Sequence, residues 1–174
     1  QTWFQRSNYG AHSGTYCAGV VAANGLQDEY LVTPALDFSS AINASIEWYE
    51  RGIGWAGSTG QHSIMVSTTS QTDPAAFSVV ALMLPGNHPI ADNWTSGPAL
   101  VNLASLSGEP VVYLAFRYYD TATAGDTWLI DDMRVYTPSV HDAGVVSVAP
   151  DGGNQGYGSP STPHGTVEKF GQGA

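Results

Sequence analysis

The clearest pattern in the chain is an alternation of side-chain types between Pro110 and Tyr119. Every second residue there is large and apolar or aromatic: Val112, Leu114, Phe116 and Tyr118. Successive side chains of a β-strand point to opposite faces, so a period of two predicts a strand with one face in a hydrophobic core. Such a strand must bury that face against a second layer of structure.

The same kind of pattern recurs along the chain in short runs. We expect strands at residues 19–22, 30–33, 45–51, 62–69, 77–84, 127–136, 144–148 and 165–171. Glycine, proline, asparagine and aspartate separate these runs, as turns require. Many short strands with almost no helical pattern predict an all-β antiparallel sandwich or barrel. We expect its core to contain Val112, Leu114 and Phe116 of this pattern together with Trp48, Ile64 and Val66.

The charge of the chain argues against two classes of partner. The 174 residues carry a formal net charge of −10, with only 5 lysines and arginines. So few cations cannot neutralise a run of phosphates, which argues against nucleic acid and against anionic membrane surfaces. No stretch of the sequence is apolar enough to span a membrane. An acidic surface is compatible with divalent cations.

Cys17 is the only cysteine, which excludes an intrachain disulfide and a cysteine-based zinc cluster. The few charges and the many small polar residues favour an extracellular or cell-surface location. The chain begins with Gln1 and shows no signal peptide, so we expect it to be a processed or excised piece of a longer protein.

Two adjacent carboxylates, Asp131 and Asp132, lie within the apolar run 127–136. In a regular strand one of them points inward, and an inward carboxylate is costly unless it is paired or binds a metal. Calcium is the simplest candidate, because it prefers oxygen ligands. The alternative is that the aspartate lies at a sheet edge and stays hydrated.

Catalytic patterns are lacking, and we expect no enzymatic activity. The histidines are scattered, and His12 and Ser13 would face opposite ways as neighbours on a strand, which makes them poor partners in a catalytic triad. Nothing in the sequence near Cys17 would lower its pKa, so a small buried thiol is the ordinary interpretation. Glu47 and Glu50 fall on opposite faces of one strand, a weak pattern for a glycosidase.

Aromatic residues are numerous and offer another kind of site. Exposed tryptophan and tyrosine side chains can stack on sugar rings or anchor a protein partner. Trp48 and Trp128 lie in strand patterns, so we expect them in the core. Trp55 and Trp94 lie among small and polar residues and are the candidates for ligand contact.

A boundary follows Tyr136. We predict a body at residues 1–136 and, at residues 137–174, a linker with strands that are too few to bury a core of their own. These strands must pack on the body, on another domain or on another chain. One prediction is therefore self-association, in which residues 140–148 or 165–171 pair with a sheet edge of a neighbouring copy.

Five segments, in order, resemble the cleaved-adhesin, or choice-of-anchor J, domains, which are MAM-like jelly-roll modules. The segments are residues 12–16, the run Asp28 to Asp37 (DEYLVTPALD), Trp94 with the later LASLSG at 103–108, residues 111–117, and GDTWLIDDM at 125–133. The tail, at residues 141–148 and 166–171, is similar to the first strands of an Ig-like, CARDB-type adhesion module.

The resemblance implies an antiparallel jelly-roll β-sandwich, found in secreted multidomain proteins. Some members bind structural calcium, and the residues that carry over are Asp131, with Asp132 and Asp126. Members usually open with a short strand whose glutamate helps to hold the metal. That strand is absent before Trp3 here, so we expect one sheet to lack a strand.

The leading prediction is a non-catalytic extracellular module for adhesion or ligand binding, with a protein or glycan at the cell surface as its partner. One alternative is a structural subunit of an extracellular filament, assembled by strand exchange between copies. Another is an accessory domain of a secreted hydrolase.

Overall fold

The computed structural model describes residues 3–54, 58–83, 93–95, 97–121, 125–137, 143–149 and 164–169. The chain divides into two compact units, Gln1–Thr137 and Pro138–Ala174. The first unit contains the hydrophobic core and all of the candidate sites discussed below.

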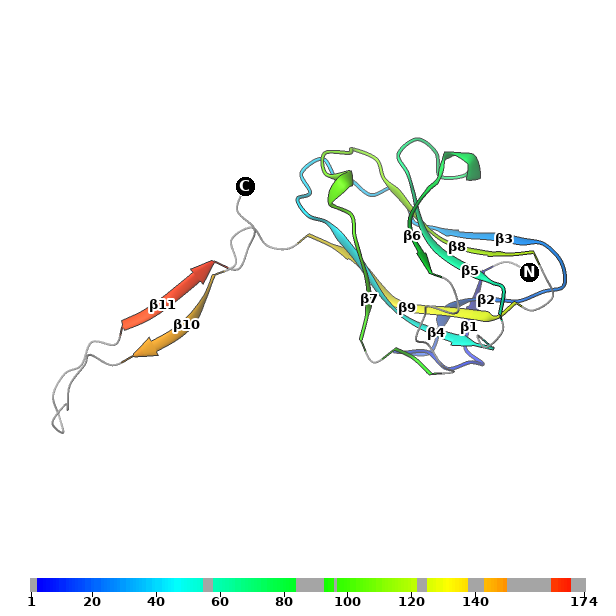
Figure 1. Cartoon of the computed structure of the whole chain (residues 1–174), viewed down its shortest axis with the longest axis horizontal. Coiled ribbons are helices and arrows are strands. Elements are labelled where there is room, and N and C mark those ends of the chain that lie inside the picture. The colour runs from blue at the N-terminus through cyan, green and yellow to red at the C-terminus, as the bar shows by residue number, and fades with distance from the viewer. Residues whose placement is uncertain are drawn as a thin grey trace. The chain divides into compact units, whose positions relative to one another are not determined.

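Two antiparallel sheets form the first unit (Figure 1). The order in the five-stranded sheet is β1 (Phe4–Arg6), β2 (Cys17–Val21), β9 (Thr127–Tyr136), β4 (Ser45–Ile53) and β7 (Ala99–Asn102). The order in the four-stranded sheet is β3 (Gln27–Val32), β8 (Tyr113–Asp120), β5 (Gln61–Ser67) and β6 (Ser78–Met83). Helix in the described residues is limited to two 3₁₀ turns, Pro74–Ala76 and Ala104–Leu106. The predicted all-β antiparallel sandwich is confirmed.

The core lies between the two sheets and contains the residues that the alternation selects. All six residues predicted to be buried are at most 7% exposed: Trp48, Ile64, Val66, Val112, Leu114 and Phe116. Trp128 is also fully buried, as expected. The rings of Trp48 and Phe116 meet edge to face across the sandwich, with centroids 5.2 Å apart. Period-two patterning therefore predicts the inner face of β4, β5 and β8 correctly.

Short elements are where the sequence prediction fails. Strands β1 and β7 span 3 and 4 residues, too few to show a period of two, and neither was predicted. The segment 12–16, where His12 and Ser13 were expected to be neighbours on a strand, is a series of bends before β2. The first strand of the body is β1, and it pairs with β2.

The second unit contains one antiparallel hairpin of β10 (Ala143–Ala149) and β11 (His164–Lys169). Strands were expected at 144–148 and 165–171, and both are present with shifted ends. Its assignment to an Ig-like module stays a prediction.

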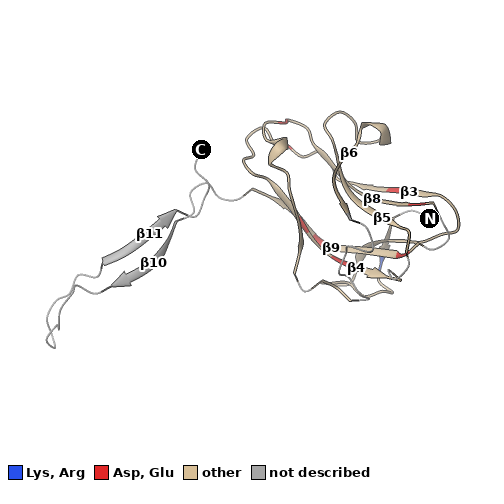
Figure 2. Ribbon diagram, viewed as in Figure 1, with Lys and Arg blue, Asp and Glu red and all other residues tan. Residues whose placement is uncertain are grey.

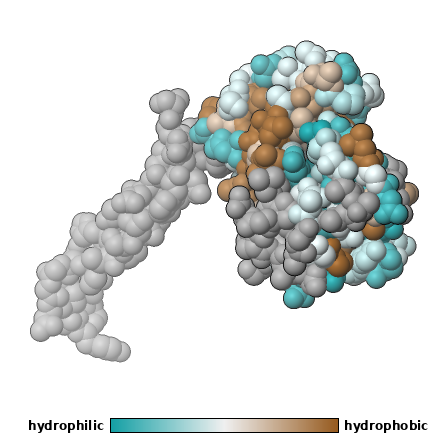
Figure 3. Space-filling view, turned by 45° about the vertical axis from the view of Figure 1, so that its right-hand side comes forward, coloured by the Kyte–Doolittle hydropathy of each residue, from teal (hydrophilic) through white to brown (hydrophobic). Residues whose placement is uncertain are grey.

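The described surface carries few cations. Acidic residues lie on strands of both sheets, and blue residues are sparse (Figure 2). Apolar side chains also reach the surface, as the brown areas of Figure 3 show; Leu26, Leu82 and Leu100 are each more than half exposed. Within the described residues, no helix has the length and apolar character needed to cross a membrane.

Candidate functional site

Strand β4 supplies the platform of the candidate site. Its even-numbered residues from Ile46 to Gly52 are buried, and its odd-numbered residues are only partly buried. Tyr49 therefore projects from the outer face of the five-stranded sheet. Its partner across the ladder is Asp131 of β9, so an aromatic ring and a carboxylate lie side by side on this face.

A β-bulge places the two adjacent aspartates. Between Asp131 and Arg134 the register shifts, because two residues of β9 face one residue of β4. Asp132 lies in this bulge with φ at +48°, a left-handed conformation that aspartate adopts more readily than most residues. Asp131 is half-buried and Asp132 is exposed, so the expectation that one of them points into the core is wrong. Alternation turns Asp131 outward after buried Ile130, and the bulge prevents Asp132 from turning inward.

The loop before β2 is held against these aspartates. The Oδ2 atom of Asp131 accepts hydrogen bonds from the backbone N–H groups of His12 (2.9 Å) and Ser13 (3.2 Å). The Asp132 carboxylate contacts His12 Nδ1 at 2.6 Å and accepts a hydrogen bond from Ser13 Oγ at 2.5 Å. These contacts join residues about 120 positions apart in the sequence. The hydrogen bonds from His12 and Ser13 hold the pKa of Asp132 below its usual value.

Three rings gather beside the carboxylates. The His12 imidazole stacks on Tyr49, with centroids 3.7 Å apart and planes at 12°. Trp94 meets His12 edge to face, with centroids 5.8 Å apart. Thr95 holds Trp94 in place, since its N–H donates to the Glu50 carbonyl at 2.9 Å. We call His12, Tyr49, Trp94, Asp131 and Asp132 the ring–carboxylate site.

The geometry does not form a catalytic triad. Ser13 bonds to Asp132, and no hydrogen bond joins Ser13 to His12 among the described contacts. The expectation that His12 and Ser13 face opposite ways on a strand was wrong. Both residues lie in a loop, and both side chains contact the Asp132 carboxylate. Cys17 is buried. Its burial, and to a smaller extent the negative charge of nearby Asp131, raises the pKa of the thiol, so the reactive thiolate is disfavoured. The site can stack on a ligand ring and accept or donate hydrogen bonds.

Asp126, the third predicted calcium ligand, lies elsewhere. It is 2% exposed, and its Oδ1 atom contacts His62 Nε2 at 3.0 Å in the core. The Asp126 backbone N–H donates to the Tyr118 hydroxyl at 3.1 Å. The structure thus brings Asp131 and Asp132 together and leaves Asp126 in a separate buried cluster. In the part of the chain that the structure describes, no three histidine, cysteine or acidic side chains are grouped to hold a metal ion.

Of the two predicted ligand-contact tryptophans, Trp94 belongs to the ring–carboxylate site, and Trp55 lies outside the described residues. Sequence reasoning missed His12 as part of the site. Its position depends on a contact with β9 that no local pattern encodes. The sequence did contain a signal for Tyr49. It follows Trp48, which was expected in the core, so alternation places Tyr49 on the outer face of the strand.

The fold is shared with solved adhesin domains. The K2 cleaved adhesin domain of Lys-gingipain has a TM-score of 0.59 and 21% sequence identity, over 79% of this chain and 84% of that domain. The K1 cleaved adhesin domain of the same protein, from Porphyromonas gingivalis W83, also has a TM-score of 0.59, with 18% identity over 79% of this chain and 85% of that domain. The predicted resemblance is confirmed at the level of the fold.

A carbohydrate-binding module has a similar fold. The family 30 module of a cellulosomal cellulase of Clostridium thermocellum has a TM-score of 0.53 and 12% identity, over 78% of this chain and 82% of that module. At the level of sequence, no family model and no curated protein matches the chain.

Proposed function

We propose that this chain is a non-catalytic extracellular module for adhesion or ligand binding. The observation that carries the proposal is the ring–carboxylate site, which gathers aromatic rings and carboxylates on the outer face of a rigid sheet. Similar folds occur in proteins named as an adhesin domain and as a carbohydrate-binding module. Fold alone does not determine function, so the proposal rests on the site.

The chemistry of the site suits a glycan. The Trp94 ring is only partly buried, and the side chains of His12 and Asp132 are 30% and 35% exposed. A sugar offers C–H groups that pack on a ring and hydroxyls that bond to a carboxylate. Tyr49 lies beneath His12 and holds its ring in position. We therefore assign Trp94, His12 and Asp132 to ligand contact and Tyr49 to positioning.

Removal of the Trp94 ring is expected to weaken glycan binding about two- to tenfold, the equivalent of roughly 0.5–1.5 kcal/mol for one ring contact. A glycan array identifies the best oligosaccharide, and titration calorimetry then compares wild type with Trp94→Ala. Tyr49→Ala should also weaken binding, because His12 loses its support. The oligosaccharide should be recovered uncleaved, since no nucleophile–base pair is assembled in the described site.

Tyr119→Ala is the matched control, because it removes a partly buried ring from the opposite sheet. It should leave glycan affinity unchanged. Equal losses in Trp94→Ala and Tyr119→Ala would refute the assignment of the site. Turnover of a bound oligosaccharide, abolished by a single substitution, would refute the non-catalytic role.

Calcium at Asp131 and Asp132 remains part of the proposal. Their carboxylate oxygens have the donor chemistry that calcium prefers. As placed, both Asp131 oxygens accept backbone N–H groups, and both Asp132 oxygens contact His12 or Ser13. Each carboxylate offers about four lone-pair sites, so acceptor positions remain beside these contacts. Asp126 belongs to a different cluster.

A calcium ion that binds only the folded chain would raise the melting temperature. At a concentration about a hundredfold above Kd, the expected rise is roughly 5–10 °C. Differential scanning calorimetry with calcium and then with chelator measures it. Asp131→Ala should abolish the difference, whereas Asp73→Ala, at an exposed turn, should preserve it. A wild-type melting temperature that calcium and chelator leave unchanged shows that there is no calcium site.

A further inference from the structure

Strand β9 has an open edge over its second half. Strand β2 pairs with β9 only from Thr127 to Ile130, whereas β4 pairs with β9 along its whole length to Tyr136. Among the described residues, no strand pairs with 131–136 on the side away from β4. The loop before β2 occupies this side at the two aspartates: backbone N–H groups of His12 and Ser13 bond to Asp131, and their side chains bond to Asp132. The backbone from Met133 to Tyr136 is left open for pairing.

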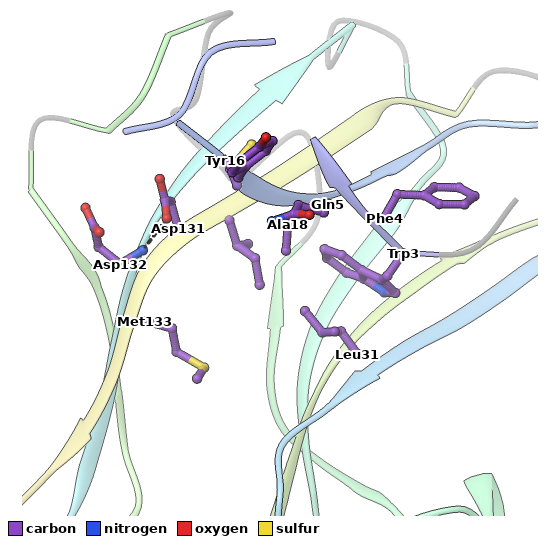
Figure 4. Close-up of a pocket in the computed structure, with 11 residues that line it drawn as sticks. Trp3, Phe4, Gln5, Tyr16, Ala18, Leu31, Asp131, Asp132 and Met133 are labelled. Carbon is purple, nitrogen blue, oxygen red and sulfur yellow. Dashed lines mark hydrogen bonds between the residues drawn. The ribbon is translucent and has the colours of Figure 1, made fainter. Parts of the chain in front are cut away.

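Two grooves lie along this edge. The first has a volume of about 460 Å³ and an apolar lining that includes Trp3, Phe4, Leu31 and Met133. Figure 4 shows Met133 projecting from β9 on one side of this groove, with Trp3 and Leu31 on the other. Met133 and Phe4 are 43% and 44% exposed.

The second groove, of about 340 Å³, lies at the end of the same strand and has a mixed lining that includes Leu36, Phe38, Val135 and the carboxylate of Asp37. Unpaired backbone flanked by grooves for side chains is the arrangement that receives an added strand. The backbone supplies hydrogen bonds, and the grooves take alternate side chains.

We propose that the open edge of β9 binds strand β10 of a second copy of this chain. The β10–β11 hairpin has only two strands, and a hairpin of this size is at best marginally stable by itself. Pairing of β10 with β9 would cover the open edge of β9. The same pairing would join the two-stranded hairpin to a larger sheet. The proposal is independent of glycan binding at the outer face.

Composition selects β10 over β11 as the donor. The sequence of β10, AGVVSVA, has no charged residue and is rich in β-branched valine. It can lie beside Asp131 and Asp132 without repulsion. Strand β11, HGTVEK, has a single valine and ends on the charged pair Glu168 and Lys169, so it is less suited to burial along this edge.

The sequence after β9 favours a contact between copies. Pro138 biases Thr137 towards extended backbone, which disfavours a tight turn at the end of β9. Donation from each copy to the next is a head-to-tail contact, which extends into an open chain unless the rotation closes a ring.

Sedimentation velocity of the full chain over a range of concentrations tests the proposal. Wild type should form dimers and larger species as concentration rises. Met133→Lys places a charge in the apolar groove and should weaken association at least about tenfold. Its control is Leu100→Lys, at an exposed leucine on β7, which forms the opposite edge of the same sheet.

A second pair of variants tests the donor strand. Val146→Asp adds a carboxylate to β10 and should weaken association to a similar extent, whereas Gln155→Asp, between the two hairpin strands, should not. A wild-type chain that stays monomeric at millimolar concentration overturns the proposal. Assembly that survives Met133→Lys rules out this edge, and assembly that survives Val146→Asp rules out β10 as its occupant.

Discussion

Replacing Trp128 by alanine is expected to destabilise the body by about 3–5 kcal/mol, the usual range for loss of a buried tryptophan. Trp128 is fully buried, its ring stacks on His62 with centroids 4.2 Å apart, and it lies edge to face with Trp3. Its indole N–H also donates to Glu50 Oε2 at 2.9 Å. Alanine therefore leaves a cavity and removes a hydrogen-bond donor from a buried carboxylate.

Urea denaturation followed by circular dichroism measures this loss. Domains of this size are stable by only about 5–15 kcal/mol, so Trp128→Phe keeps the test decisive if the alanine variant fails to fold. Phenylalanine fills most of the cavity but cannot donate to Glu50, so a loss of about 1–3 kcal/mol is expected. Leu100→Ala, at an exposed position, should change stability by less than about 0.5 kcal/mol. A Trp128→Ala variant as stable as Leu100→Ala would contradict the packing described here.

The second large effect is expected at the buried His62–Asp126 pair. Both side chains are fully buried, and the atoms in contact are 3.0 Å apart. Replacing His62 by alanine removes the partner of a buried carboxylate, a change that costs about 3–5 kcal/mol. Combining it with Asp126→Ala should cost less than the sum of the two single losses, because the two residues interact.

Arg134→Ala provides the comparison for this pair. Arg134 Nε lies 2.7 Å from Glu47 Oε1, but its side chain is 65% exposed. An exposed ion pair contributes at most about 1 kcal/mol, so this loss should be small. Equal losses from His62→Ala and Arg134→Ala, or strictly additive losses within the buried pair, would contradict the predicted coupling.

The sequence alone predicted the body of the sandwich. The hydrophobic pattern of 45–51, 62–69 and 110–119 assigned the inner face of β4, β5 and β8 correctly, since burial of alternate residues is a local property of a strand. It also placed Trp48 and Trp128 in the core. It missed β1 and β7, which are strands only because a neighbouring strand pairs with them.

Tertiary structure decided the sites. Asp131 and Asp132 were recognised as unusual, but a regular strand would have turned one of them inward, and the bulge in the pairing with β4 keeps Asp132 out of the core. His12 belongs to the site because a loop crosses to β9, and Asp126 is excluded because it pairs with His62. The open edge of β9 likewise follows from where β2 ends in the ladder. A local pattern determines which way a side chain points from its own strand, whereas register, bulges and loop contacts depend on residues distant in the sequence.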